Sequence, residues 1–411
     1  MKVINLKRHS TFKKIVFFTL FALLNACTNE PEQGSTQWAL GSAGSGQSHI
    51  SKFEDSLVIS WLEPLNESIG LYYQVFDDEL NRGTRNLVAS GDDWFVNWAD
   101  FPSVTPINSD LWVSHWLVYQ EDFLGYDARY AVSSDGGQTW SQARTLHENL
   151  LPVEHGFVEI FPTNNGFAAV WLDGENYAIQ DMNTTQGTIL KYAEFDIYGN
   201  KQFEQGIDTL VCDCCQPDIS QDDIATYIVY RDRSEQNIRD IKLMIKPHEG
   251  QWGEIISLPD DNWFIEGCPV NGPSLASSGQ GLGVSWYTNV NDIPKIRFAY
   301  FDHQDDSFTA ELDVEEGAPW GYVDTAYDPY NDNFIVSWLR SGSTGVELVA
   351  ASIGSSGMLN KENILFSSQI SYPLDFPKIE IIGDKLVATW TDFSDGMTLK
   401  AQSFELNELS F

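Results

Sequence analysis

Short runs of apolar and β-branched residues recur along the chain. Each run ends in a large aromatic residue and is followed by a polar loop. The first run is Leu-Val-Ile-Ser-Trp61, and successive terminal aromatics lie 55, 55, 59, 56, 52 and 52 residues apart. A fixed period of this size is typical of repeat arrays and propellers, so we expect one supersecondary unit per repeat. The seven aromatics are Trp61, Trp116, Trp171, Tyr230, Trp286, Trp338 and Trp390.

A proline precedes the aromatic residue in four of the repeats. Pro102 lies 14 residues before its aromatic, whereas Pro217, Pro273 and Pro377 each lie 13 residues before theirs. Proline is tolerated at the start of a strand, where no ladder donor is needed. We therefore expect an inner strand after the proline, a second strand with the aromatic, a third strand such as 69–76 or 128–133, and an outer fourth. Units of four antiparallel strands are propeller blades.

The chain is thus predicted to be all-β, a propeller of seven blades, or of six if one repeat is irregular. The last repeat, 376–406, has room for only three strands, and we expect the segment 36–42 to supply the missing outer strand. That pairing would join the two ends of the propeller and cover an exposed sheet edge. The seven aromatics are expected to pack between neighbouring blades.

The N-terminal segment has the layout of a secretory signal. Basic residues precede a short apolar run, 15–24. The run is followed directly by Asn25-Ala26-Cys27. The run is short for a transmembrane helix. A cysteine after a small residue resembles the bacterial lipobox, which implies that Cys27 is lipidated. We therefore predict a signal peptide at 1–26, a tether at 27–36, a propeller at 37–411, and an outer-membrane lipoprotein on the periplasmic or cell-surface side. An ordinary signal peptide with a chance cysteine is the alternative.

The chain is strongly acidic, with a formal charge of −35 at neutral pH. Such an excess argues against nucleic acid and anionic membrane surfaces as partners. Any membrane contact is therefore expected through the lipid alone. The protein is expected to be monomeric and to need no cofactor.

The second repeat contains Ser-Ser-Asp-Gly-Gly-Gln-Thr-Trp at 133–140. This resembles the Asp-box of sialidases and related BNR-repeat propellers, in which the turn is structural and lies away from the active site. Asp and Ser side chains cap backbone amides in such turns, and glycine takes the positive φ. The matching positions are Ser133, Asp135, Gly137, Thr139 and Trp140.

A second resemblance covers Cys-Asp-Cys-Cys-Gln-Pro at 212–217, Tyr-Arg-Asp-Arg at 230–233 and Gly-Cys-Pro-Val-Asn-Gly-Pro at 267–273. It is similar to bacterial propellers described as sialidase-like. Aromatic and acidic residues such as Trp98, Trp263 and Asp100 are expected on the same face as these motifs, and aromatic faces beside carboxylates suit sugar rings, which predicts a carbohydrate ligand. Authentic sialidases carry an Arg-Ile-Pro motif that contributes to a three-arginine clamp on the sialic carboxylate. No such motif occurs here, so sialidase activity itself does not follow.

The loops of repeats four and five concentrate residues that carry chemistry. In a propeller, the loops before the inner strands and those after the second strands share one face, which usually holds the ligand site. Arginine binds carboxylate or sulfate bidentately, and paired aspartates serve as acid and base when one is desolvated. Structural ion pairs that brace the blade are the alternative. We predict ligand-binding roles for Arg231, Arg233, Arg239, Glu266 and Asn271, and catalytic roles for Asp232 and Asp240.

Four cysteines remain beyond Cys27, namely Cys212, Cys214, Cys215 and Cys268. An even number in an exported protein indicates disulfides. Cys212 and Cys268 each lie five residues before the proline of their repeat, so a bond between them would join adjacent blades, although Cys214 or Cys215 could take the place of Cys212. A zinc or copper site that also uses His155, or reactive thiols, are the alternatives.

These observations favour an exported propeller that binds or cleaves a glycan, with glycosidase-type hydrolysis of an anionic sugar if it is an enzyme. Two other functions stay open. One is a non-catalytic outer-membrane scaffold that presents surfaces to protein partners, and the other is a metal or redox protein that uses the cysteines. Because propellers support many functions, the fold alone does not choose among them.

Overall fold

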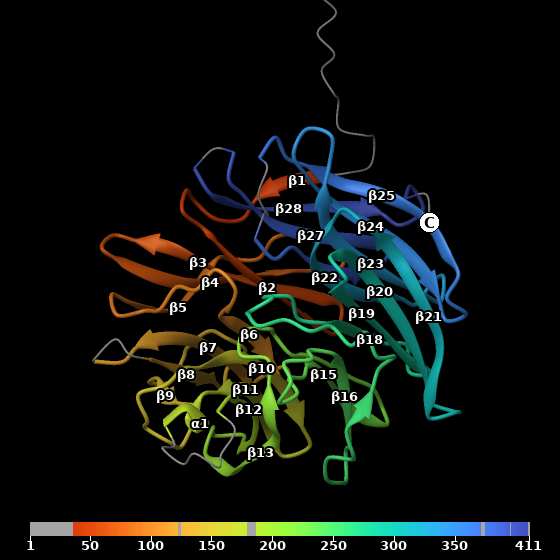
Figure 1. Ribbon diagram of the computed structural model, residues 1–411. Helices are drawn as coiled ribbons and strands as arrows, with labels where there is room; N and C mark the ends of the chain where they lie inside the picture. The colour runs from red at the N-terminus through yellow and green to blue at the C-terminus, as the bar shows by residue number, and fades with distance from the viewer. Residues whose placement is uncertain (1–35, 122–124, 179–185, 371–374, 395, 410–411) are drawn as a thin grey trace, which may run out of the picture. The chain divides into compact units, whose positions relative to one another are not determined.

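The computed structural model describes residues 36–121, 125–178, 186–370, 375–394 and 396–409. Within them the chain forms seven antiparallel sheets of four strands, arranged around a central axis as the blades of a propeller (Figure 1). The predicted all-β fold with seven blades is confirmed, and the alternative with six is wrong. The predicted signal peptide and Cys27 lie outside the described residues. No helix in the described part is long and apolar enough to cross a membrane.

The blades follow one another along the chain, and blades one to six have their strands in sequence order from the axis outward. Blade one contains β2 (Gly46–Phe53), β3 (Ser56–Leu65), β4 (Ser68–Phe76) and β5 (Asn86–Gly91). Blade two contains β6 (Ser103–Pro106), β7 (Trp112–Tyr119), β8 (Tyr126–Ser133) and β9 (Arg144–Thr145). Blade three contains β10 (His155–Thr163), β11 (Gly166–Asp173), β12 (Thr188–Asp196) and β13 (Lys201–Val211), with a short helix α1 (Glu175–Ala178) between β11 and β12.

The remaining blades repeat the pattern. Blade four contains β14 (Asp218–Gln221), β15 (Ala225–Arg231), β16 (Ile241–Pro247) and β17 (Ile256–Ser257). Blade five contains β18 (Ser274–Ser277), β19 (Gly281–Val290), β20 (Ile293–Asp302) and β21 (Ser307–Glu316). Blade six contains β22 (Pro319–Asp328), β23 (Asn333–Ser341), β24 (Val346–Gly354) and β25 (Leu359–Ser367). Blade seven contains β26 (Lys378–Ile382), β27 (Lys385–Asp392), β28 (Thr398–Glu405) and, from the other end of the chain, β1 (Thr36–Ala39).

The strand β1 closes the ring as the sequence predicts. It pairs antiparallel with β28, with Thr36 opposite Ser403 and Ala39 opposite Lys400. In Figure 1 the red N-terminal strand lies beside the blue strands of the C-terminal end. This pairing covers the outer edge of β28, which would otherwise expose unpaired backbone groups.

The repeating aromatic residue lies on the second strand of every blade and is at most 5% exposed. Because both faces of each blade are covered by neighbouring blades, these side chains form the core between the sheets. Two of the buried indole N–H groups donate to a carboxylate two residues along the strand, where a side chain returns to the same face. Trp61 donates to Glu63 at 3.1 Å, and Trp171 donates to Asp173 at 2.9 Å.

The prolines mark the starts of inner strands. The strands β6, β14, β18 and β26 each begin at the residue directly after Pro102, Pro217, Pro273 and Pro377. The rule that proline occurs where no ladder donor is required therefore positions four of the seven inner strands.

The turn between β8 and β9 has the hydrogen bonds expected of its sequence. Asp135 accepts hydrogen bonds from the hydroxyl of Thr139 at 2.6 Å and from its backbone N–H at 2.8 Å. These bonds lower the pKa of Asp135 to about 2. The hydroxyl of Ser133 accepts from the amide of Gly137 at 2.9 Å, and Gly137 has a φ of 84°. Trp140 packs edge-on against Tyr73 of blade one, so the turn braces two blades.

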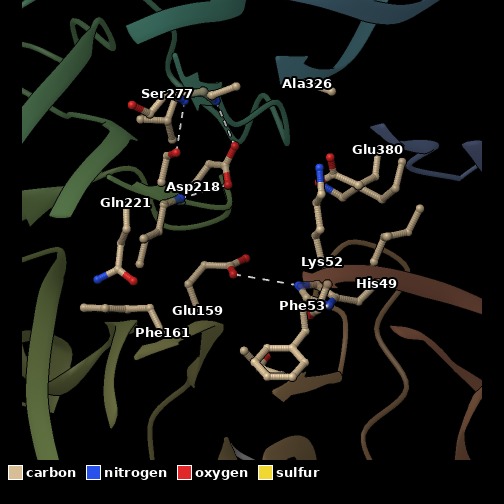
Figure 2. Close-up of a pocket in the computed structure, with 18 of the residues that line it drawn as sticks. His49, Lys52, Phe53, Glu159, Phe161, Asp218, Gln221, Ser277, Ala326 and Glu380 are labelled. Carbon is tan, nitrogen blue, oxygen red and sulfur yellow. Dashed lines mark hydrogen bonds and ion pairs between the residues drawn. The ribbon is translucent and has the colours of Figure 1, made fainter. Parts of the chain in front are cut away.

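The inner strands enclose a channel along the axis, with a cavity of about 550 Å³ (Figure 2). Lys378 lies 3.2 Å from Asp324, and the charges of Asp324, Asp218 and Glu159 raise the pKa of Lys378 although burial lowers it. Burial and Asp218 raise the pKa of Glu159 to about 8. The channel therefore holds a compact network of opposite charges.

Aromatic side chains narrow the channel at the end where the inner strands begin. The space there is about 40 Å³. Phe376 contacts Phe101 and Tyr322 with ring centroids 5.1 Å and 4.5 Å apart. A ligand on that face of the propeller would therefore contact these aromatic side chains at the axis.

Candidate functional site

Two adjoining cavities lie over blades three to five, on the face where the inner strands begin. They have volumes of about 390 Å³ and 460 Å³ and share Tyr177 and Asp213 in their walls. We call the pair the groove. The blade-three side includes Tyr126, Glu154, Tyr177, Thr188 and Asp213. The blade-four side includes Tyr177, Asp213, Arg233, Arg239, Glu266 and Cys268.

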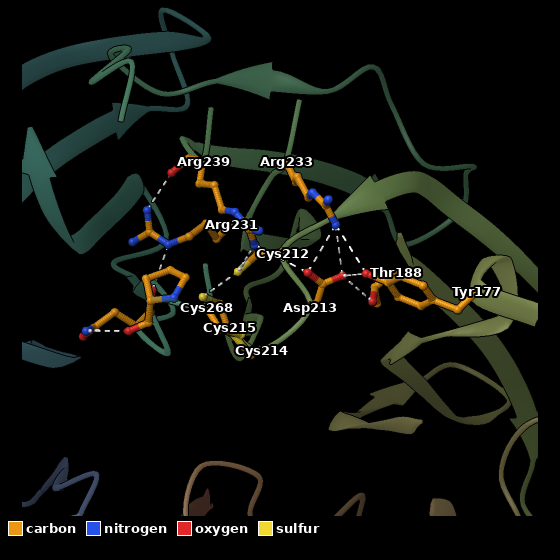
Figure 3. The surroundings of a disulfide bond; sticks show 12 residues. Tyr177, Thr188, Cys212, Asp213, Cys214, Cys215, Arg231, Arg233, Arg239 and Cys268 are labelled. Atoms are coloured by element: carbon orange, nitrogen blue, oxygen red, sulfur yellow. Dashed lines mark hydrogen bonds and ion pairs between the residues drawn. A yellow bond between two sulfur atoms is a disulfide. The ribbon is translucent and has the colours of Figure 1, made fainter. Parts of the chain in front are cut away.

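Tyr177, Asp213 and Arg233 meet where the two cavities join (Figure 3). The Tyr177 hydroxyl donates to Asp213 Oδ1 at 2.7 Å, and Thr188 donates to the same oxygen at 2.9 Å. A guanidinium nitrogen of Arg233 lies 3.3 Å from Asp213 Oδ2 and 3.4 Å from the Tyr177 hydroxyl. Burial and the adjacent Asp213 raise the pKa of Tyr177, so its hydroxyl keeps its proton at neutral pH.

Local sequence explains how these groups come together. Tyr177 lies in the short helix α1, which connects the second and third strands of blade three, and Asp213 lies in the loop before the inner strand of blade four. Arg233 follows β15 in a tight turn, in which Ser234 N–H donates to the Ile238 carbonyl at 2.9 Å. Three sequence-distant loops thus place a phenol, a carboxylate and a guanidinium side by side.

Of the predicted ligand-binding residues, Arg233, Arg239 and Glu266 line the groove. The Arg233 side chain is 21% exposed and the Arg239 side chain only 4%. Arg239 donates to Cys212 Sγ at 3.2 Å and lies 3.6 Å from Asp213. Its Nε is buried and has no hydrogen-bond partner among the described residues. Arg233 is therefore the guanidinium best placed to meet a ligand.

Arg231 has a different environment from the one the sequence indicates. It is the last residue of β15 rather than a loop residue, and it is 2% exposed. Its guanidinium donates to the carbonyls of Asn271 at 2.9 Å, Arg239 at 2.7 Å and Tyr287 at 2.6 Å, and it lies over the Trp263 ring. Because its three nitrogens are engaged by backbone, Arg231 joins blades four and five and has no donor directed into the groove.

Asn271 belongs to the same buried arrangement. Its side-chain oxygen accepts from the Tyr322 N–H at 2.8 Å, and its amide nitrogen lies 3.3 Å from the carbonyls of Pro269 and Trp320. The donors and the acceptor of the Asn271 side chain are thus all used to hold loops of blades five and six. The ligand-binding role predicted for Asn271 has no free group to support it.

The two predicted catalytic aspartates differ in environment. Asp240 is 7% exposed and accepts from the backbone N–H groups of Asn262 at 3.0 Å and Trp263 at 3.1 Å, which fixes the loop before blade five. Burial raises the pKa of Asp240 despite these bonds. Burial and the nearby Asp208 raise the pKa of Asp232 to about 6. Neither carboxylate is among the groove-lining residues, so an acid or base in the groove comes from elsewhere.

Among the described residues, Cys212 and Cys215 are free, so the prediction that they also form disulfides is wrong, and the disulfide is between Cys214 and Cys268 (Figure 3). This bond joins the loops before the inner strands of blades four and five, as predicted, and it uses Cys214, one of the two alternatives to Cys212. Cys212 extends the sheet, since its N–H donates to the Arg231 carbonyl at 2.9 Å, and this turns its side chain inward. Cys212 and Cys215 are buried, with their sulfur atoms 2.8 Å apart.

The environment of Cys212 makes its thiol acidic. Burial raises the pKa of Cys212, but the hydrogen bond with Cys215 and the charges of Arg239 and Arg231 outweigh it and bring the pKa to about 7. Burial raises the pKa of Cys215. Among the described residues, His155 lies with His147 and Asp127 and not with the cysteine cluster.

Tyr177, Glu154 and Thr188 also line the groove, although the sequence does not predict them as site residues. They lie in loops whose approach to blade four depends on packing between blades, which no local pattern reveals. Asp213 lies within the Cys-Asp-Cys-Cys motif, but the sequence does not indicate a role for it. Partial burial in the groove and the charge of Asp213 raise the pKa of Glu154, so this carboxyl is a candidate proton donor.

Comparison with solved structures supports the architecture. The chain is similar to an ulvan lyase, a polysaccharide lyase solved bound to a GlcA(1-4)Rha3S chain, with a TM-score of 0.55, 10% identity and coverage of 90% of this chain and 96% of that one. It is similar to the polysaccharide lyase Uly1, with a TM-score of 0.55, 10% identity and coverage of 90% and 91%. A subtype N10 neuraminidase-like protein associated with the little yellow-shouldered bat has a TM-score of 0.46, 9% identity and coverage of 91% and 98%.

No protein-family model matches the chain. No curated protein matches it either. At about 10% identity the structural similarities establish the fold, a seven-bladed β-propeller, and not an activity.

Proposed function

We propose that this propeller binds an anionic glycan in the groove and cleaves it at a glycosidic bond. The observation that carries the proposal is the contact of Tyr177, Asp213 and Arg233 at the junction of two cavities. The protein has a formal charge of −35, so a partly exposed arginine in a groove is a local exception that favours a negatively charged ligand. The similarity to two propellers described as polysaccharide lyases supports the same class of ligand.

The proposed roles follow from charge and position. Arg233 binds the carboxylate or sulfate of a sugar through its planar fork. Tyr177 is protonated; its proton, which bonds to Asp213 in the free groove, passes to the departing glycosidic oxygen, and the proton that restores Tyr177 comes from the water that adds in hydrolysis or from C5 of the uronate in elimination. Glu154 faces the same cavity and provides a second group for proton transfer. The same residues suit hydrolysis and elimination, and the products distinguish the two reactions.

Binding is tested with a panel of polysaccharides, containing uronate, sulfate or neither, by isothermal titration calorimetry. The wild-type protein is expected to bind at least one anionic member and no neutral one. Arg233→Ala is expected to lower affinity at least about tenfold, as for loss of a charge-assisted contact. Arg340→Ala is the matched control because Arg340, in blade six, is 17% exposed and paired with Glu347. Equal affinity of the two variants for the anionic polysaccharide would show that the groove is not the binding site.

We also propose that the chain is a lipoprotein of the outer membrane, anchored through Cys27. The support is the sequence around Cys27 alone. Expression of the full chain with radiolabelled palmitate tests it, with Cys27→Ser as control. Incorporation into the wild type but not into the variant supports the anchor, and equal absence of label from both contradicts it.

A further inference from the structure

Trp98 exposes an indole ring on the same face of the propeller as the groove. It lies in the connection between β5 and β6, before the inner strand of blade two, and it is 53% exposed. Trp263, which the sequence also predicts on this face, is 5% exposed and lies against the Arg231 guanidinium. Of these two indoles, that of Trp98 is therefore the one that a ligand can reach.

The backbone that carries Trp98 is buried and tied to the walls of the groove. The next two residues, Ala99 and Asp100, are 3% and 2% exposed. Asp100 Oδ2 accepts from the Phe157 N–H at 2.8 Å, and Phe157 lines the blade-three side of the groove. The Ala99 carbonyl accepts from the side chain of Gln216, which lies in the loop before the inner strand of blade four. These contacts fix the Trp98 backbone beside the groove.

The Trp98 ring belongs to the aromatic surface at the axis. It packs against Phe376, with ring centroids 5.8 Å apart and an angle of 42° between the ring planes. Phe376 and Phe157 both line the narrow axial space, and Phe157 lines the groove as well. An apolar surface therefore connects Trp98 with the blade-three side of the groove.

The size of this surface indicates what covers it. Phe376 is 8% exposed, and Phe101 and Tyr322 are half-buried, so Trp98 is the exposed member of the group. An aromatic side chain offers at most about 250 Å² of surface, whereas a stable protein interface takes about 800 Å² from each partner. One exposed indole instead matches the face of a single sugar ring, since sugar rings have C–H groups on their faces and hydroxyls at their edges.

We propose that Trp98 stacks on a sugar ring of the same glycan chain whose charged unit is bound by Arg233. The inference rests on the proposed function and extends it, because the ligand is then a polymer that reaches from the groove to the axis. Recognition has two parts. The guanidinium of Arg233 selects a carboxylate or sulfate, whereas the indole of Trp98 selects a C–H face, so the second ring need not be charged.

Binding of ulvan, polygalacturonate and chondroitin sulfate is measured by isothermal titration calorimetry for the wild type, Trp98→Ala, Arg233→Ala and Tyr330→Ala. Tyr330→Ala is the matched control, because Tyr330 is 69% exposed but lies in the turn between β22 and β23, at the opposite end of the inner strands. Trp98→Ala is expected to lower affinity for the polymer that binds at least about fivefold, and Tyr330→Ala to keep the wild-type value. Circular dichroism checks that each variant folds.

Fluorescence separates stacking from an indirect effect on the groove. Acrylamide quenches exposed indoles, so the bound polymer is expected to reduce quenching of the wild type, and this reduction is expected to be absent from Trp98→Ala. Wild-type affinity of Trp98→Ala, or wild-type quenching that the bound polymer does not change, would overturn the inference. Weakened binding by Arg233→Ala in the same experiment would leave the proposed function in place. No binding of the three polymers by the wild type would contradict both.

Discussion

The hydroxyl of Tyr177 donates a 2.7 Å hydrogen bond to Asp213 across the boundary between blades three and four. Tyr177 comes from the connection between β11 and β12, and Asp213 from the loop before β14. The pair exists only when both blades are in place. The chemistry proposed for the groove therefore depends on the contacts that hold neighbouring blades together, and the first predictions concern those contacts.

Removing the disulfide is expected to destabilise the propeller without changing its fold. Cys214 and Cys268 are separated by 54 residues, and closing a loop of this length stabilises by roughly 4 kcal/mol in the chain-entropy model. We expect Cys214→Ser/Cys268→Ser to lose about 2 to 4 kcal/mol of unfolding free energy in urea denaturation. A thiol reductant should lower the stability of the wild type more than that of the double variant. Equal stability of variant and wild type would contradict this.

Arg231 and Arg233 are two residues apart but should respond differently to mutation. Arg231→Met leaves three buried carbonyls without a donor, and each such loss costs about 1 to 3 kcal/mol. We expect a loss of at least about 3 kcal/mol of unfolding free energy. Arg233→Ala removes a partly exposed ion pair, which is worth less than about 1 kcal/mol. Denaturation of both variants checks the contrast, and similar losses would show that Arg231 is not a structural residue.

Asp100 makes a pH-dependent contribution to stability. It is 2% exposed, and burial, aided by the charge of Glu154, raises its pKa to about 7 although it accepts from the Phe157 N–H at 2.8 Å. The folded state therefore holds a proton that the unfolded state releases near pH 4, so the contribution of this group falls as pH rises from about 4 to 7 and levels off above that range.

Asp100→Asn should remove this dependence. Relative to the wild type, the variant is expected to gain unfolding free energy between pH 5 and pH 8, with an upper limit of roughly 4 kcal/mol from the size of the pKa shift. Chemical denaturation at several pH values measures the difference. Parallel stability curves for the two proteins would show that Asp100 does not titrate in this range.

The architecture was predictable because it is encoded in repeated local patterns. The recurring aromatic identifies the second strand of each blade, and prolines such as Pro217 identify the starts of inner strands. The three-stranded last repeat left an edge that only an N-terminal strand could cover, and β1 pairs there with β28. Each of these signals depends on spacing along the chain, which sequence displays directly.

The site was only partly predictable because its residues meet through packing. Sequence located Arg233, Arg239 and Glu266 in the correct loops, since the unusual loops of blades four and five are visible as motifs. It did not show that Arg231 extends β15 into the interior, where backbone carbonyls use its donors. The approach of Tyr177 to Asp213 depends on the angles between blades, for which the sequence contains no local signal.

Cleavage of an anionic polysaccharide by the wild type, Tyr177→Phe and Arg340→Ala tests the central proposal most directly. The products are followed as new reducing ends, and ultraviolet absorbance of an unsaturated uronate separates elimination from hydrolysis. We predict that Tyr177→Phe lowers kcat by at least about a hundredfold, in the range of general acid–base catalysis, while the control keeps wild-type activity. Cleavage by Tyr177→Phe at the wild-type rate, or no cleavage by any of the three proteins although the wild type binds the glycan, would contradict a catalytic groove.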